Sequence, residues 1–180
     1  MSDLDYDCAG CGRRHGGGDG TEADPWPLID FPQPEALLRM NPWEQLMRSR
    51  STEELCLIDN GTSVDCYLRG FLSLPVRGEE ALLVFAPWVK VSGEDYLDLV
   101  EQWEHPRFRG EYQGTLASLL PGHEDSLSVP VHVVAPGRLP PVIAPVASSG
   151  HLLVEEERCG ISRQEAELRL RSMLLEDAGF

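Results

Sequence analysis

Apolar and polar positions follow a β-strand pattern from residue 55 onward. The apolar run Leu55-Cys56-Leu57-Ile58 ends at Asp59-Asn60-Gly61, and every second residue from Val64 to Leu68 is apolar. An apolar run, an Asn-Gly turn and a period of two predict a β-hairpin with one buried face. The stretches 71–76 and 82–91 read as further strands, the second disturbed at Pro87. We therefore expect three or four antiparallel strands in sequence order.

Helical periodicity flanks this block. Asn41 is a predicted N-cap before Pro42, for a short helix through Trp43, Leu46 and Met47. Ser92 and Asp95 predict the start of a second helix that ends at Pro106, and Ser162 with Glu165 predicts a final one ending near Gly179. Tyr96, Leu99, Val100 and Trp103 fall on one face of the second helix, which should pack on the sheet. The last helix has apolar positions at Ala166, Leu168, Leu170, Met173 and Leu174.

The remaining pattern predicts the fold class. Stretches 129–135 and 142–146 resemble strands, and their prolines favour the edge of a sheet. Because strands follow one another without intervening helices, we expect an α+β fold with a mostly antiparallel sheet flanked by helices. We expect one domain, 1–180. It would begin with a segment similar to a zinc knuckle (1–20) and a proline- and aromatic-rich arm with a short helix (21–50). A sheet core with one helix (51–160) and a carboxy-terminal helix (161–180) would follow. Trp26 and Phe31 should hold the arm on the core.

Composition narrows the range of partners. The 180 residues are 42% hydrophobic and 25% charged, typical of a globular domain, and the formal net charge is −15. This charge repels nucleic acid and anionic membranes, so neither is an expected partner. No apolar run is long enough to span a membrane, and the acidic start does not resemble a signal peptide. We expect a cytoplasmic protein; the oligomeric state is left open.

The cysteines suggest chemistry at the amino terminus. Cys8 and Cys11 are spaced as in zinc knuckles, with Gly12 following and His15 near enough to be a third ligand. Five cysteines, an odd number, fit metal ligation better than a disulfide framework. A closed structural zinc site needs a fourth ligand, and Cys56 is the preferred candidate, ahead of Cys159, His123 and His151. The alternatives are free thiols on a mobile tail and, less favoured, a redox CxxC pair.

Catalytic motifs are missing from the sequence. It contains no nucleophile elbow, phosphate-binding loop, dinucleotide fingerprint or His-Glu-x-x-His motif. The group His123-Glu124-Asp125 follows a Pro-Gly turn, and a solvated turn is preferred there to a metal or catalytic role. Cys66 is expected to be a small buried residue rather than a nucleophile. Arg69 is expected to bridge to an acidic side chain, and Trp88 and Trp103 to pack in or near the core.

Several short motifs in order are similar to a bacterial family known only as domain of unknown function 2199. They are Cys8-x-x-Cys11-Gly12-x-x-His15, Leu55-Cys56-x-Ile58-Asp59, Tyr67-Leu68-Arg69-Gly70, Trp88-Val89-x-Val91-Ser92, Leu120-Pro121-Gly122 and Gly160-Ile161. The resemblance implies a pairing of Cys56 with the knuckle but brings no established activity. This chain departs from the family pattern at Phe85-Ala86-Pro87, where a Trp-Gly is usual, and at His123, where tyrosine is usual.

The leading hypothesis for function is a non-enzymatic, zinc-binding module that works through a protein partner, with aromatics of the arm as one contact face. A sharper version is an acidic immunity or inhibitor protein that neutralises a basic toxin or nuclease by electrostatic steering. The rival class is a metal- or thiol-dependent enzyme that uses Cys66, His123 or His132 in a cleft.

Overall fold

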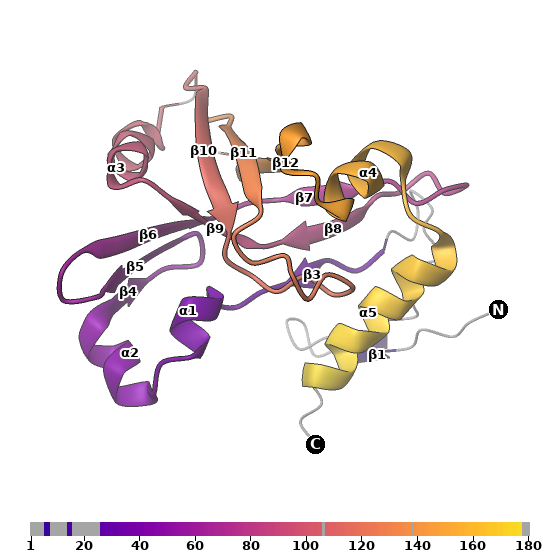
Figure 1. Ribbon diagram of the computed structural model, residues 1–180, viewed down its shortest axis with the longest axis horizontal. Helices are drawn as coiled ribbons and strands as arrows, with labels where there is room; N and C mark the ends of the chain where they lie inside the picture. Colours follow the sequence, from indigo (N-terminus) through magenta and orange to yellow (C-terminus); the bar gives the residue numbers. More distant parts are fainter. Residues whose placement is uncertain (1–5, 8–13, 16–25, 106, 138, 178–180) are drawn as a thin grey trace.

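The computed structural model describes residues 6–7, 14–15, 26–105, 107–137 and 139–177, and Figure 1 shows strands flanked by helices. The strands are β1 (Tyr6–Asp7), β2 (Arg14–His15), β3 (Ile29–Asp30), β4 (Ser49–Ser51), β5 (Leu55–Asp59), β6 (Val64–Arg69), β7 (Leu72–Leu74), β8 (Leu83–Ala86), β9 (Trp88–Val91), β10 (Gly110–Leu116), β11 (Pro130–Ala135) and β12 (Val142–Pro145). The helices are α1 (Glu35–Leu38), α2 (Pro42–Arg48), α3 (Gly93–Gln102), the 3₁₀ turn η1 (Ala147–Ser149), α4 (Leu152–Cys159) and α5 (Arg163–Asp177). The α+β class is confirmed.

The main sheet has seven strands in the order β12-β11-β10-β9-β6-β5-β4, and every neighbouring pair is antiparallel. The predicted hairpin is confirmed: β5 and β6 pair from Leu55 opposite Leu68 to Asp59 opposite Val64. Gly61 in the turn has φ of +83°, a conformation that glycine adopts without a steric penalty. The hairpin therefore forms where its local signals predict it.

The apolar stretch 82–91 supplies strands to two different sheets. β8 lies between β3 and β7 in a three-stranded sheet, whereas β9 lies between β6 and β10 in the main sheet. Pro87 separates them and has no N–H to donate to either ladder, so the chain can change sheets there. The expectation of strands paired in sequence order was wrong, because β6 pairs with β9 and not with β7.

Strand β10 was not predicted. Its sequence, GEYQGTL, has few apolar residues, yet it pairs with β9 on one side and β11 on the other. A Cβ atom at Gly114 would lie 2.5 Å from Cγ1 of Val89, so the close approach of β9 requires glycine. Tyr112 is buried and its hydroxyl donates a hydrogen bond to Asp98 in α3 (2.7 Å). The edge position predicted for stretches 129–135 and 142–146 is confirmed for β12 but was wrong for β11, which lies between β10 and β12.

The predicted helix starts are confirmed. Asn41 and Glu44 form a complete capping box on α2, the Ser92 hydroxyl accepts from the Asp95 N–H, and the Ser162 hydroxyl accepts from the Glu165 N–H. The inward assignment of Val100 was wrong, since Val100 is exposed, and Leu168 of α5 is exposed as well. The apolar residues of α2 are exposed as well: Trp43, Leu46 and Met47 lie on one helical face that is not covered by the described residues.

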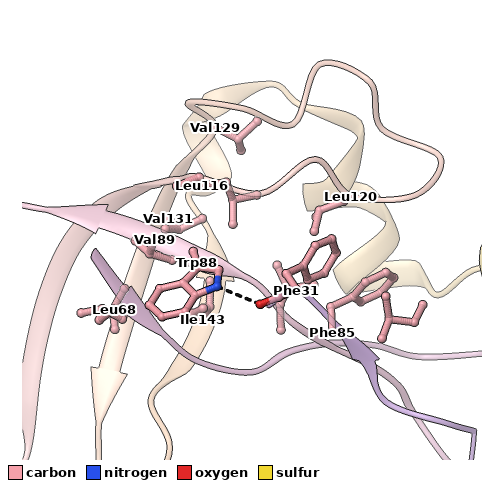
Figure 2. Packing of buried hydrophobic residues seen from close by; sticks show 14 of the residues in the cluster. Phe31, Leu68, Phe85, Trp88, Val89, Leu116, Leu120, Val129, Val131 and Ile143 are labelled. Carbon is pink, nitrogen blue, oxygen red and sulfur yellow. Dashed lines mark hydrogen bonds between the residues drawn. The ribbon is translucent and has the colours of Figure 1, made fainter. Parts of the chain in front are cut away.

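The arm is held on the core as expected. Trp26 and Phe31 are buried, and β3 between them pairs in parallel with β8. Figure 2 shows the Nε1 of Trp88 donating to the backbone oxygen of Phe31, at 2.8 Å. Arg69 forms an ion pair with Asp30 of the arm, so the bridging role expected for it is confirmed. Because Trp26 and Phe31 are buried, they do not form the contact face that we expected of the arm.

The carboxy-terminal helices lie at the end of the molecule that holds β7 and β8, away from β4 and α2 (Figure 1). Helix α4 was not predicted, whereas α5 begins after the predicted cap. A parallel bridge between Val76 and Ile161 connects the segment after β7 to the short link between α4 and α5. Within the described ranges, no helix combines the length and the apolar character needed to cross a lipid bilayer.

Candidate functional site

Two of the predicted metal ligands, Cys8 and Cys11, lie outside the described residues. The strands on either side of them are described: β1 and β2 pair antiparallel, with Tyr6 opposite His15 and Asp7 opposite Arg14. This pairing places Asp7 and Arg14, the described residues on either side of segment 8–13, opposite each other. His15, the predicted third ligand, is the last residue of β2.

The other predicted donors are dispersed over the fold. Cys56 is completely buried in β5, and burial raises the pKa of its thiol. In the view of Figure 1, β1 is drawn on the side of the picture that holds α5, whereas β5 is drawn on the opposite side. Cys159 is exposed at the end of α4. Cys66 is buried in β6, as expected for a packing residue, and burial raises the pKa of its thiol too.

His123 and His151, which were reserve candidates for one ligand position, lie side by side. Their ring centroids are 5.2 Å apart with the rings tilted by 48°. They are 28 residues apart in the chain, one in the loop after β10 and the other at the N-cap of α4. Together with Asp125, they are the group of described residues whose ligand atoms all lie within 4.8 Å of one another.

Buried hydroxyls hold the loop that carries His123 and Asp125. Ser118 accepts from the backbone N–H of Trp88 (3.0 Å), which ties the loop to the central strand. Ser126 accepts from the N–H of Leu120 (2.9 Å) and donates to the carbonyl of Ser118 (3.2 Å). Since both serines are buried, these hydrogen bonds form in a low-dielectric environment and fix the loop.

Glu156 and Arg169 surround one side of the His123 ring. The Nε2 of His123 lies 2.7 Å from Oε2 of Glu156. Arg169 donates to both oxygens of Glu156, at 2.9 and 2.8 Å, and its Nε donates to Glu165 at 2.8 Å. His123 is 3% exposed and Arg169 is 4% exposed. The three side chains therefore connect the loop, α4 and α5 through a nearly buried ionic network.

The charges in this network stabilise one another. Burial alone would raise the pKa of Glu156, but hydrogen bonds from His123 and Arg169, with the positive charge of Arg169, lower it to about 2. Burial alone would lower the pKa of Arg169, but its contacts with Glu156 and Glu165 raise it. Glu156 is thus a carboxylate near neutral pH and accepts hydrogen bonds only, which places a proton on Nε2 of His123.

His151 and Asp125 form the second half of the group. The Nδ1 of His151 accepts from the N–H of Leu153 (3.1 Å) and so caps α4, while Nε2 lies 3.0 Å from Oδ1 of Asp125. The hydrogen bond from His151 lowers the pKa of Asp125, whose side chain is 83% exposed. Asp125 is therefore open to solvent, whereas both imidazole rings are largely enclosed.

A hollow of about 530 Å³ lies beside the network and is lined by Arg169, Glu156 and Cys159, among others. A second hollow of about 470 Å³ lies on the other side of Gly122 and is lined by Phe31 and Glu124, among others. A Cβ atom at Gly122, where φ is +81°, would lie 2.9 Å from Nε of Arg169. Glycine at this position thus lets the loop approach the guanidinium group.

The sequence indicated only part of this cluster. His123-Glu124-Asp125 was recognised as polar, but the solvated turn expected there was wrong for His123, which is buried. Glu156 and Arg169 were missed. A signal for Arg169 was present, because it lies three residues after Ala166 and four before Met173, on the face that α5 turns toward the core.

Comparison with known proteins gives one match. Residues 7–161 match a family described as an uncharacterized protein conserved in bacteria, DUF2199. No curated protein and no solved structure matches the chain.

Proposed function

This chain belongs to the DUF2199 family of uncharacterised bacterial proteins, and we propose that it is a cytoplasmic, non-enzymatic, zinc-binding module that works through a protein partner. The observation that carries the proposal is the pairing of β1 with β2 around segment 8–13. Two cysteines separated by two residues suit a zinc knuckle, because both thiolates come from one short stretch of the chain. Cys8, Cys11 and His15 are the proposed ligands.

Zinc content tests the knuckle. The purified protein, dialysed free of loosely bound metal, is expected to lose about one zinc per chain when Cys8 and Cys11 are both replaced by serine, because a hydroxyl does not replace a thiolate on zinc. Elemental analysis provides the measurement. Cys66→Ser is the control, since Cys66 is a packing residue of β6 and is not a candidate ligand of the knuckle. Equal zinc content in the wild type and the double variant would exclude the knuckle.

Cys56 is kept as the proposed fourth ligand and has its own test. Its thiol is buried and carries a raised pKa, so zinc would have to displace the thiol proton in a low-dielectric environment. Cys56→Ser keeps the size of the side chain and removes the thiolate. Loss of zinc in this variant supports Cys56, and retained zinc assigns the fourth position to another donor.

Helix α3 supports a partner with a positively charged surface. Its ten residues include Glu94, Asp95, Asp98 and Glu101 and no lysine or arginine, and Leu97 and Val100 are exposed beside these carboxylates. Exposed apolar side chains beside several carboxylates favour a partner that is positively charged. The net charge of −15 adds long-range attraction to such a partner. An immunity or inhibitor protein for a basic toxin or nuclease is the sharpest form of this proposal.

Association kinetics test that surface. The probe is a basic nuclease, and its association rate is expected to fall severalfold in Glu94→Gln/Glu101→Gln and to fall further as salt increases. Glu53→Gln/Glu54→Gln removes the same charge from exposed residues before β5 and serves as the control. Stopped-flow fluorescence gives the rates. Equal rates for both double variants would show that α3 is not the contact surface.

A further inference from the structure

We propose that His123, Asp125 and His151 bind one divalent transition-metal ion at a site separate from the amino-terminal cysteines. Two imidazole nitrogens and one carboxylate oxygen are a donor set that zinc and its neighbours in the first transition row accept. Each of the three residues has one possible ligand atom within 4.8 Å of those of the other two, and Nε2 of His151 lies 3.0 Å from Oδ1 of Asp125. Two ligands of one tetrahedral zinc ion are about 3.4 Å apart, so small side-chain movements complete the site.

The surroundings of His123 select its coordinating atom. Nε2 is already engaged, since it lies 2.7 Å from Oε2 of Glu156 and 3.3 Å from Nη1 of Arg169, and in the described part of the chain no residue forms a hydrogen bond with Nδ1. The lone pair of a neutral imidazole is then on Nδ1. A carboxylate on the far nitrogen of a metal-binding histidine fixes its tautomer and makes it a stronger ligand. Arg169, through its two hydrogen bonds to Glu156, holds that carboxylate in place.

His151 coordinates through Nε2, and this has a structural consequence. In the structure, Nδ1 accepts from the N–H of Leu153, so the proton of the neutral ring is on Nε2. Metal binding at Nε2 moves that proton to Nδ1 and removes the hydrogen bond from Leu153. One capping hydrogen bond is weak compared with three bonds to a divalent ion, so the site tolerates this loss.

Three protein ligands leave a fourth position for water or another small ligand. Asp125 is exposed, so an ion held beside it is reached from solvent, while the two imidazoles approach it from the protein side. Closed structural sites use four protein ligands, and sites with three keep an open position. The site therefore resembles an exchangeable metal centre more than a structural one. It does not depend on the proposed zinc knuckle.

The test uses full-length protein in which Cys8 and Cys11 are serine, so that thiolates at the amino terminus cannot contribute. Titration with zinc chloride in a calorimeter is expected to give about one saturable site per chain. Adding Asp125→Asn or His151→Gln is expected to weaken zinc binding by about tenfold or more. His132→Gln is the matched control, because His132 is an exposed histidine on β11. Asp125 is exposed, so its replacement leaves the core intact.

A second readout follows the tautomer change. The Leu153 amide signal in NMR spectra is expected to shift and exchange faster with solvent when zinc is added, and in Asp125→Asn the same change is expected to need about tenfold more zinc or more. Absence of a saturable site, or an affinity that Asp125→Asn and His151→Gln leave equal to that of His132→Gln, would overturn the proposal. The proposed zinc knuckle is tested by a different measurement, which compares the zinc content of the purified wild type with that of the serine double variant.

Discussion

Replacing Trp88 with alanine is expected to lower the free energy of unfolding by about 3–5 kcal/mol, a large part of the ~5–15 kcal/mol that stabilises a typical domain. Trp88 lies in the central strand β9 and is completely buried. The indole ring fills the space where the arm meets the sheet, and its Nε1 is the donor to the Phe31 carbonyl. Its removal leaves a cavity and a buried carbonyl without its partner.

Urea unfolding followed by far-UV circular dichroism measures this effect, with Trp43→Ala as the matched control. Trp43 is 68% exposed on α2, so its loss is expected to change stability by about 0.5 kcal/mol or less. Trp88→Phe keeps most of the volume but not the donor, and should fall between the two. If Trp88→Ala and Trp43→Ala unfold at the same urea concentration, the packing described for the central strand is wrong.

Replacing Arg169 with methionine is expected to cost about 3–5 kcal/mol, because it leaves Glu156 as a largely buried carboxylate without its bidentate partner. Arg39→Met is the control. Arg39 also pairs with a glutamate four residues away, but its side chain is 65% exposed, and such surface pairs contribute about 0–1 kcal/mol. Urea unfolding near neutral pH compares the two. Equal, small losses would indicate that the Arg169 network does not stabilise the fold.

The pH dependence of stability gives the same pair a second test. The pKa of Glu156 is lowered in the folded protein to about 2 from an ordinary value of 4.5. Because the folded-state value is depressed, the stabilisation is fully present above about pH 4.5 and is lost as pH falls toward about 2. In Arg169→Met this acid-dependent loss is expected to be smaller, since one of the groups that lowers the pKa is gone. An unchanged loss would contradict the assignment.

Local signals predicted much of the fold. The hairpin of β5 and β6 follows from an alternation of apolar residues and an Asn-Gly turn that act within fifteen residues. The caps at Asn41, Ser92 and Ser162 were found because each side chain bonds to the backbone three residues later. Such interactions involve residues close together in the chain, so they can be predicted without the tertiary structure.

The pairing of strands that are distant in the chain could not be predicted from local signals. The polar strand β10 is stabilised by the strands on both sides of it, and its own sequence has little β character. The division of residues 82–91 between two sheets depends on where β6 and β3 lie, although Pro87 marked the break. Tertiary packing outweighed local preference in both cases.

The two candidate metal sites also differ in whether local sequence signals could predict them. The amino-terminal site was proposed from sequence alone, because Cys8 and Cys11 are two residues apart and their spacing is itself the signal. The cluster of His123, Asp125, His151, Glu156 and Arg169 has no such spacing: its members come from one loop and two helices. Side chains that lie as far as 46 residues apart in the chain, as His123 and Arg169 do, leave no local pattern when they meet.

The sequence by itself determined the α+β class, the hairpin, the helix caps, the strong negative charge and the cysteine motif, because each arises from composition or from residues close together in the chain. Only the tertiary structure decided the strand order, the burial of Trp88 under the arm and the meeting of His123 with His151. The physical reason is that burial and ionic contacts depend on distance in space, and the folded chain brings distant residues together.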